Sequence, residues 1–306
     1  MRPWMLPLAL IVVLALPLLP GGYVLYIASL VLIYVLASFG TNILTGYTNL
    51  ISLAGATFFG IGAYGSAIFS SQFGLPLPLA MLAAASLAAV VGLLLALPVL
   101  RLEEVFLAIA TLGFVMVFME LAKQGGSFTG GESGMAGPKP MLAGFALGER
   151  GFYLFIVAVL MGCLWMARNL SDSRFGRAFL ALKGSETAAR SLGLDVRRLK
   201  LTAFGICAFY TGMAGTLFAP LVRFVDPSVF DIMVSISFVS MIIIGGIGSV
   251  WGSVLGAIFV AGAPQLLTYV GLDNVQRSLY GVAMILSLMF LPDGLVSLFR
   301  PRGHKA

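Results

Sequence analysis

Residues 23–39 read YVLYIASLVLIYVLASF, a run in which no side chain carries a charge. The run lies inside a far longer charge-free region, because positions 3–100 contain no Asp, Glu, Lys or Arg. Of all 306 residues, 10% are charged, whereas soluble proteins average about 25%. A water-exposed fold cannot be built from such a sequence. The pattern is typical of helices that span a lipid bilayer, and it excludes an ordinary soluble domain.

Similar apolar runs recur on both sides of this stretch. A helix needs about 20 residues to cross a bilayer, so we expect an all-α membrane protein of about ten transmembrane helices. The whole chain, 1–306, would form one domain. The expected spans are residues 1–19, 23–39, 50–70, 76–100, 105–121, 152–167, 201–221, two spans within 232–270, and 278–291. Residues 1–19 also have features of a signal peptide, but another apolar run follows at once, which favours a first span.

Small residues mark the span at 50–70, which reads LISLAGATFFGIGAYGSAIFS. Gly60 and Gly62 would let neighbouring backbones approach closely, so we expect this span inside the bundle. A second glycine group interrupts the apolar region 232–270, at Gly245, Gly246 and Gly248. This group forms either a turn between two spans or part of a re-entrant segment.

Uncharged polar side chains in and beside the early spans are candidates for a path across the membrane. Their hydroxyl, phenol and amide groups can hydrogen-bond to a passing zwitterion, or instead to a neighbouring helix. The candidates are Asn42, Asn49, Ser52, Thr57 and Tyr64.

Two longer connections separate the spans. Residues 122–151 contain FTGGESGMAGPKP, in which Thr129, Gly130 and Gly131 form either a flexible turn or an outside loop near the mouth of a pore. Residues 168–200 hold eight basic and three acidic residues, and so +5 of the net charge of +6. Cytoplasmic connections collect Lys and Arg. With ten spans and both termini inside, inside segments hold 13 basic residues and outside loops 5, which supports that topology.

The centre of the basic loop predicts a short helix. Ser185-Glu186-Thr187-Ala188-Ala189-Arg190-Ser191-Leu192-Gly193 has helix-forming residues, and Gly193 is a plausible stop. Such a helix between two spans could dock on a cytoplasmic partner and transmit its movement. The alternative is a basic loop that fixes topology and contacts anionic lipid.

The chain lacks the motifs of several other functions. It has no GxxxxGK[ST] phosphate loop. Its cysteines, Cys163 and Cys207, lie in apolar runs as packing residues, and its one histidine is His304. We therefore expect no metal site and no catalytic residues. The basic residues cluster beside apolar spans, which indicates membrane orientation rather than nucleic-acid binding.

Four groups of motifs together resemble one family of transport proteins. They are FGRA at 175–178 with Glu186, Ala188, Ala189, Gly193, Lys200, Ala203 and Phe204; SLAGATFFGIGAY at 52–64; TGGESG at 129–134; and GGIGS at 245–249 with Gly252 and Gly256. Their order and spacing, over about residues 40–295, resemble the permeases of branched-chain amino-acid (LIV-type) ABC transporters. The FGIGAY and TGG forms are more similar to the LivM-type subunit than to its LivH-type partner.

The resemblance implies a permease subunit of an ATP-driven importer in an inner membrane. Its partners would be a second homologous permease, two cytoplasmic ATPase subunits and a periplasmic substrate-binding protein. ATP and Mg would bind to the ATPase subunits, and this chain would hold no cofactor and catalyse no reaction. The cytoplasmic coupling loop at 168–200 would contact an ATPase through Arg177, Glu186, Ala188, Ala189 and Gly193, and the 122–151 loop would lie near the docked binding protein.

One difference from the family bears on the substrate. Many relatives have a histidine in the segment that aligns with Ala54-Gly55-Ala56, where this chain has Gly55. The resemblance implies branched-chain or similar hydrophobic amino acids as substrates, while related permeases carry urea, short amides or aromatic amino acids. A self-sufficient channel or ion-coupled carrier, in which the basic loop only sets topology, is the alternative from another class.

Overall fold

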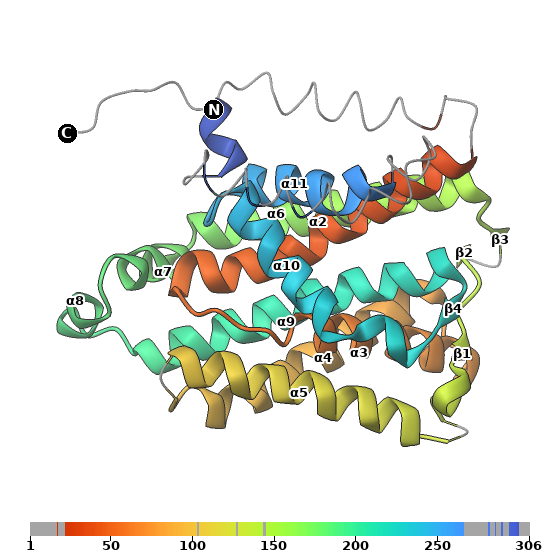
Figure 1. The fold of residues 1–306 in the computed structure, drawn as a ribbon, viewed down its shortest axis with the longest axis horizontal. Helices are drawn as coiled ribbons and strands as arrows, with labels where there is room; N and C mark the ends of the chain where they lie inside the picture. The colour runs from red at the N-terminus through yellow and green to blue at the C-terminus, as the bar shows by residue number, and fades with distance from the viewer. Residues whose placement is uncertain are drawn as a thin grey trace.

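The computed structural model describes residues 22–102, 104–126, 128–142, 145–265 and 294–299, and the single positions 17, 281, 285 and 289. Long helices run side by side along the molecule (Figure 1). They are α2 (Gly22–Thr48), α3 (Gly55–Ser71), α4 (Leu77–Val99), α5 (Glu104–Gln124), α6 (Glu149–Asp172) and α9 (Val196–Val222). The shorter helices are α7 (Arg174–Gly184), α8 (Glu186–Ser191), α10 (Ile232–Gly245) and α11 (Val250–Ala257), which continues as the π-helical segment η4 (Ile258–Gly262).

Helix α9 lies at the centre of the bundle and packs against α2, α3 and α4. Its contact with α3 is made by glycines. A Cβ atom on Gly62 of α3 would lie 1.9 Å from the carbonyl oxygen of Gly212, and one on Gly215 would lie 1.9 Å from the carbonyl oxygen of Phe59. Only residues without a Cβ allow the two backbones to come this close. Most of α3 is buried, in the interior position expected for the span at 50–70.

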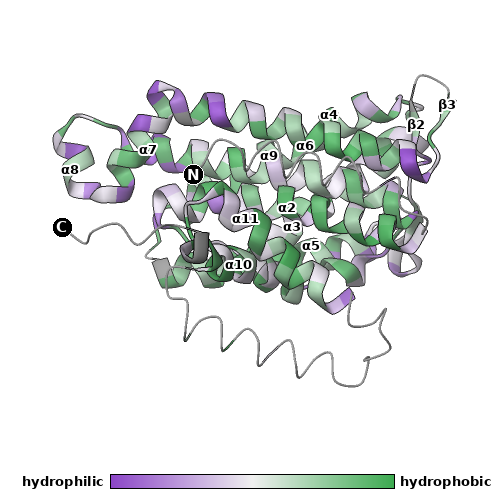
Figure 2. Ribbon diagram, turned by 90° about the horizontal axis from the view of Figure 1, so that it is seen from above, coloured by the Kyte–Doolittle hydropathy of each residue, from purple (hydrophilic) through white to green (hydrophobic). Residues whose placement is uncertain are grey.

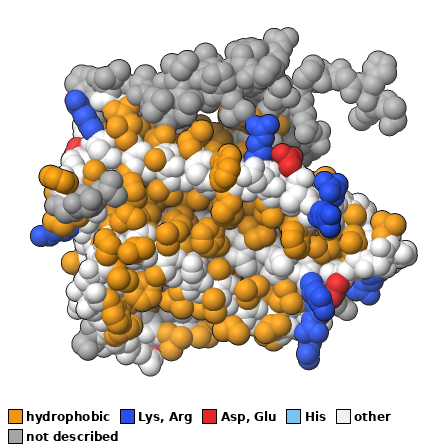
Figure 3. Space-filling model, turned by 180° about the vertical axis from the view of Figure 1, so that it is seen from behind, with side chains coloured by type: hydrophobic (Ala, Val, Ile, Leu, Met, Phe, Trp, Pro, Cys, Tyr) orange, Lys and Arg blue, Asp and Glu red, His pale blue; other side chains and the backbone are white. Residues whose placement is uncertain are grey.

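The surface of the bundle is apolar over its middle and polar at its two ends. Hydrophilic residues gather around α7 and α8 at one end and near β2 and β3 at the other (Figure 2). Large apolar side chains such as Leu94, Val105 and Trp165 are exposed. From behind, a broad apolar surface is bordered by Lys and Arg side chains (Figure 3). Continuous exposed apolar surface of this extent suits contact with lipid.

The structure supports an all-α membrane protein but does not confirm ten spans. Among the described residues, five helices are long and apolar enough to cross a membrane, namely α2, α4, α5, α6 and α9. Helix α3, with 17 residues, is shorter than these. The expected spans at 1–19 and 278–291 lie outside the described residues except for single positions, as do both chain ends.

The region expected to hold a turn between two spans or a re-entrant segment is sharply bent at its glycines. α10 and the apolar helix that follows, Val250–Gln265, are bent by 119° at the glycine break. α10 has 14 residues and is therefore about 21 Å long, which is short of a bilayer core of about 30 Å. Gly246 and Gly248 have φ angles of 122° and 78°, values that residues with a side chain rarely adopt. The pair is one bent unit, and with this unit counted as a span the described residues hold up to six candidate spans.

The connection at 122–151 is built from short hydrogen-bonded pieces. The 3₁₀ turn η2 (Gly131–Ser133) leads to β1 (Met135–Ala136), which pairs antiparallel with β4 (Phe224–Val225) after α9. The hairpin of β2 (Met141–Leu142) and β3 (Phe145–Ala146) follows. Thr129 Oγ1 donates to the Ala122 carbonyl oxygen at 2.7 Å, and Gly130 and Gly131 adopt positive φ angles. Defined hydrogen bonds thus tie this loop to the ends of α5 and α9.

The glycine contact between α3 and α9 leads to a stability prediction. Gly62→Ala and Gly215→Ala must push the two helices apart, so each should lower the free energy of unfolding by about 1–3 kcal/mol or more. Gly113→Ala is the matched control, because nothing lies within 4 Å of a Cβ at that position of α5. Thermal unfolding of the detergent-solubilised chain measures all three. Equal melting temperatures for the three variants would contradict the packing described.

Candidate functional site

Three helices, α7, α8 and α9, begin one after another within the basic loop. The loop lies at one end of the bundle, where α7 and α8 project beyond the long helices (Figure 1). Each start is capped by a short polar side chain. Ser173 Oγ accepts from Phe175 N at 3.1 Å, Ser185 Oγ accepts from Ala188 N at 3.3 Å, and Asp195 Oδ1 accepts from Arg198 N at 3.1 Å. Such caps satisfy amide groups that have no partner within the helix. They explain why the chain breaks into short helices here rather than forming one long span.

The short helix predicted around Glu186 is α8, and Gly193 lies in the turn after it. Gly193 has a φ angle of 77°, and its N–H donates to the Arg190 carbonyl oxygen at 2.9 Å. Ala189 is fully buried in a cluster with residues of α4 and α9, whereas Ala188 and Leu192 are exposed. One side of α8 is therefore attached to the bundle, and the opposite side is open to a partner.

Glu186 is the centre of the charge network on this helix. Its Oε1 lies 2.7 Å from Arg190 NH2, and its Oε2 lies 2.7 Å from Lys200 Nζ, whose side chain is 17% exposed. The hydrogen bond from Lys200, together with the charge of Arg190, holds the pKa of Glu186 below its ordinary value. The carboxylate therefore stays ionised at neutral pH and fixes α8 to the start of α9.

A small cavity opens beside this network. Its volume is about 210 Å³, and its charged lining consists of Glu186 with Arg101, Arg190, Arg197 and Lys200. Four cations around one carboxylate leave an excess of positive charge, which favours an acidic group from outside. Sequence analysis grouped Lys200 with Glu186 in one motif but did not connect Arg101 with them, because Arg101 follows α4 in a distant part of the chain. The sequence indicated only that all these basic residues lie on the inside of the membrane, and not that they surround one carboxylate.

Arg177 lies apart from this network. It belongs to the first turn of α7 and donates through NH1 to the Asp172 carbonyl oxygen at 3.2 Å. The structure thus places Glu186, Ala188, Ala189 and Gly193 on or next to α8, and Arg177 one helix earlier.

The end of α7 contacts the glycine break between α10 and α11. A Cβ on Gly248 would lie 2.6 Å from Lys183 Nζ, so the lysine side chain lies directly against this turn. Asn49 Nδ2 also reaches the Lys183 carbonyl oxygen, at 3.5 Å. The basic loop is therefore in contact with the bent unit of the bundle. No motif in the sequence indicated this contact.

Asn42 of α2 holds the same break from the other side. Its Nδ2 donates to the Ser249 carbonyl oxygen at 2.8 Å and to Ser253 Oγ at 2.9 Å, and its Oδ1 accepts from Gly248 N at 2.7 Å. The backbones also approach closely, since a Cβ on Gly46 would lie 2.7 Å from Gly248 Cα. The three hydrogen bonds of this side chain are thus all made with residues 248–253, at the break and the start of α11.

The other candidate path residues lie in different surroundings. Ser52 Oγ accepts from Ala54 N at 3.3 Å, just before α3, and Asn49 is exposed. Thr57 Oγ1 and Tyr64 Oη are buried and have no hydrogen-bond partner among the described residues. The Tyr64 ring packs against Phe118 and Phe230. The two unpaired groups on α3 are thus the ones free to bind something else.

In the described part of the chain, no three His, Cys, Asp or Glu side chains come close enough together to hold a metal ion.

Comparison with known proteins now adds to this geometry. Residues 23–288 match the family described as the permease component of branched-chain amino acid transport systems. The chain belongs to this permease family. It is 34% identical over 301 residues to the high-affinity branched-chain amino acid transport system permease protein LivM of Escherichia coli K12, covering 90% of this chain and 70% of that protein. LivM of Salmonella typhimurium is 33% identical over the same shares of the two chains.

More distant relatives differ in their named transport systems. The probable branched-chain amino acid permease LivM of Methanocaldococcus jannaschii is 26% identical over 71% of this chain and 67% of its own length. The xylose permease XylH of E. coli K12 is 32% identical over 35% of this chain and 28% of its own. No solved structure matches the chain.

The Asn42 contacts lead to a second stability prediction. Asn42→Ala leaves Gly248 N–H and the Ser249 carbonyl without their partner, so the free energy of unfolding should fall by about 2 kcal/mol or more. Asn49→Gly removes the same amide from an exposed site with a φ angle of 54° that glycine adopts readily, and should change it by less than about 0.5 kcal/mol. Thermal unfolding in detergent compares the two. A loss of equal size in both variants would contradict the structural role of Asn42.

Proposed function

We propose that this permease is the LivM-like membrane subunit of an ABC importer that carries branched-chain or related hydrophobic amino acids across an inner membrane. Its partners are a second homologous permease, two cytoplasmic ATPase subunits that bind ATP and Mg, and a periplasmic substrate-binding protein. The chain has no cofactor of its own and makes or breaks no bond in the substrate. The observation that carries the proposal is the position of α8, attached to the bundle by Ala189 and Glu186 with its other side exposed.

In this mechanism, α8 is the element that receives the movement of an ATPase subunit. The exposed side with Ala188 and Leu192 offers the contact, and the basic cavity beside Glu186 accepts an acidic side chain of that subunit. Movement of α8 and α7 reaches the α10–α11 break through Lys183, which lies against Gly248. The helices that hold the break then shift together, and the path opens to one side at a time.

The substrate path in this proposal runs along α3. Thr57 and Tyr64 supply hydroxyl groups that have no partner among the described residues, and the rings around Tyr64 offer an apolar surface to a hydrophobic side chain. Gly55 is already packed against Phe238, 2.9 Å from where its Cβ would be. A histidine there would displace that ring, so this part of α3 is packed differently from that of relatives with the histidine. Urea, short amides and aromatic amino acids are therefore alternative substrates.

Transport in proteoliposomes tests the proposed function. The chain is reconstituted with and without its candidate permease, ATPase and binding-protein partners, and uptake of labelled leucine, phenylalanine and urea is followed. We expect leucine uptake that requires ATP and every partner. Uptake by this chain alone would overturn the importer in favour of a channel or ion-coupled carrier.

Variants of the basic loop test the role of α8. Glu186→Gln removes both ion pairs of the helix, and Gly193→Ala strains its terminating turn at a φ angle of 77°. Both should reduce ATPase association or substrate-stimulated ATP hydrolysis several-fold, with a stability loss of about 1 kcal/mol or less because the ion pairs are partly exposed. Glu120→Gln, whose carboxylate bonds locally to Gln124 on α5, is the control. Normal transport by both loop variants would refute the assignment.

A pair of tyrosine variants tests the substrate path. Tyr64→Phe removes a hydroxyl that has no partner among the described residues, so stability should hardly change while uptake of the amino acid falls. Tyr210→Phe removes a hydroxyl that donates to the Cys163 carbonyl oxygen at 3.0 Å, and should cost about 1 kcal/mol of stability. Melting temperature and uptake are measured on both. Wild-type uptake by Tyr64→Phe would exclude its hydroxyl from the path.

A further inference from the structure

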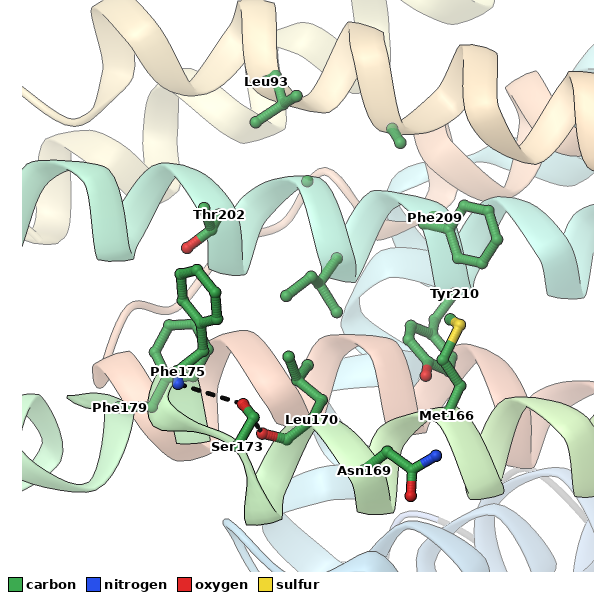
Figure 4. Close-up of a pocket in the computed structure, with 13 residues that line it drawn as sticks. Leu93, Met166, Asn169, Leu170, Ser173, Phe175, Phe179, Thr202, Phe209 and Tyr210 are labelled. Atoms are coloured by element: carbon green, nitrogen blue, oxygen red, sulfur yellow. Dashed lines mark hydrogen bonds between the residues drawn. The ribbon is translucent and has the colours of Figure 1, made fainter. Parts of the chain in front are cut away.

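A large groove lies on the outside of the bundle, away from α3 and from the α10–α11 break. It is formed by α4, α6 and α9, with the start of α7 at one end, and has a volume of about 770 Å³ (Figure 4). Its lining is almost entirely apolar, and includes Leu93 from α4, Met166 and Leu170 from α6, and Ile206 and Phe209 from α9. Gly205 also lines the groove, and a Cβ there would lie 3.0 Å from Leu93 Cδ2, so the missing side chain lets Leu93 pack against α9.

The groove becomes polar toward the basic loop. Ser173 and Thr202 line this end together with the Phe175 and Phe179 rings (Figure 4). A second cavity of about 310 Å³ adjoins this end, since Phe175 and Thr202 line both. The second cavity is also lined by Arg174 and Arg198. The apolar groove and a cavity lined by two guanidinium groups thus lie next to each other, with Phe175 and Thr202 between them.

The charges at this end favour an anion. Arg174 is exposed, and no ion pair holds it among the described residues. Arg198 pairs through Nε with Asp195 at 2.8 Å, and its side chain is 85% exposed. A guanidinium has five N–H donors, so this pair leaves the terminal nitrogens of Arg198 available. Asp195 also lines the second cavity, which leaves a net positive charge there within a loop that holds eight basic residues.

The length of the groove along α9 is similar to the thickness of one leaflet of a bilayer. From Thr202 to Tyr210, α9 advances by about 12 Å, which compares with about 15 Å for one leaflet of the hydrocarbon core. The basic end coincides with the change from apolar span to charged loop, where lipid headgroups lie.

We propose that this groove is a binding site for one anionic phospholipid. Acyl chain lies along Leu93, Ile206 and Phe209, and the phosphate lies between Arg174 and Arg198. An apolar face alone would accept any lipid or a protein helix. The two guanidinium groups at its headgroup end select an anionic lipid. The bound lipid links α6 and α7 to α9 and so supports the base of the basic loop. The proposal requires only that the chain spans a membrane, and it is independent of substrate and partners.

Native mass spectrometry of the full chain in detergent tests the site. The probes are phosphatidylglycerol and phosphatidylcholine with the same acyl chains. We expect the wild type to retain phosphatidylglycerol preferentially. The double variant Arg174→Gln and Arg198→Gln should weaken that binding by about tenfold or more. The control, Lys123→Gln with Arg150→Gln, changes the net charge equally at positions that do not line the groove, and should leave it unchanged.

A second pair of variants tests the apolar part. Ala89 lines the groove on α4, so Ala89→Phe should fill it and reduce retention of both lipids. Leu87→Phe places the same ring on an exposed part of α4 outside the groove and should not. Equal retention of the two lipids by the wild type, or no effect of the arginine pair, would overturn the proposal. A photo-crosslinker at Phe209 that captures a protein subunit in membranes, and no phospholipid, would also overturn it.

Discussion

The fold depends on how the chain satisfies its backbone where α10 ends and α11 begins. A helix broken inside an apolar bundle exposes N–H and C=O groups that cost several kcal/mol each if left unpaired. The amide of Asn42 solves this for the break, because it accepts from Gly248 N and donates to the Ser249 carbonyl oxygen. α2, the same helix that packs along α9, therefore holds the bent unit in place.

Glycine makes the same region compact enough to move as one piece. A Cβ on Gly245 would lie 1.9 Å from the Gly252 carbonyl oxygen, and one on Gly256 would lie 1.8 Å from that of Met241. α10 and α11 thus pack backbone to backbone despite the 119° bend between them. Close-packed units of this kind shift as rigid bodies rather than deform continuously. With Lys183 against Gly248, the basic loop is positioned to bias such a unit, and the proposed transport mechanism uses this contact.

Sequence analysis identified what local composition determines. Apolar runs located α2, α4, α5, α6 and α9, and Ser185 with Gly193 bracketed α8, because membrane depth and helix caps act within a few residues. A break at the glycines between α10 and α11 was expected, as a turn or part of a re-entrant segment, but its closure by Asn42 was not predicted, because that contact joins residues about 200 positions apart. The contact between Glu186 and Lys200, which are 14 residues apart, was also not predicted, because it depends on how the chain turns between α8 and α9. The count of ten spans is not confirmed, because five or six candidate spans are found among the described residues, and two expected spans lie outside them except for single positions.

The central claim is that α8 and the α10–α11 break move together. Spin labels at Thr187 on α8, Val250 at the start of α11 and Val105 on α5 allow pairwise distances to be measured by pulsed electron resonance in the assembled transporter, with and without ATP. The account predicts that both the Thr187 and Val250 labels shift relative to Val105 when ATP binds, while the distance between them stays constant. A shift of the Thr187 label with no change between Val250 and Val105 would contradict it.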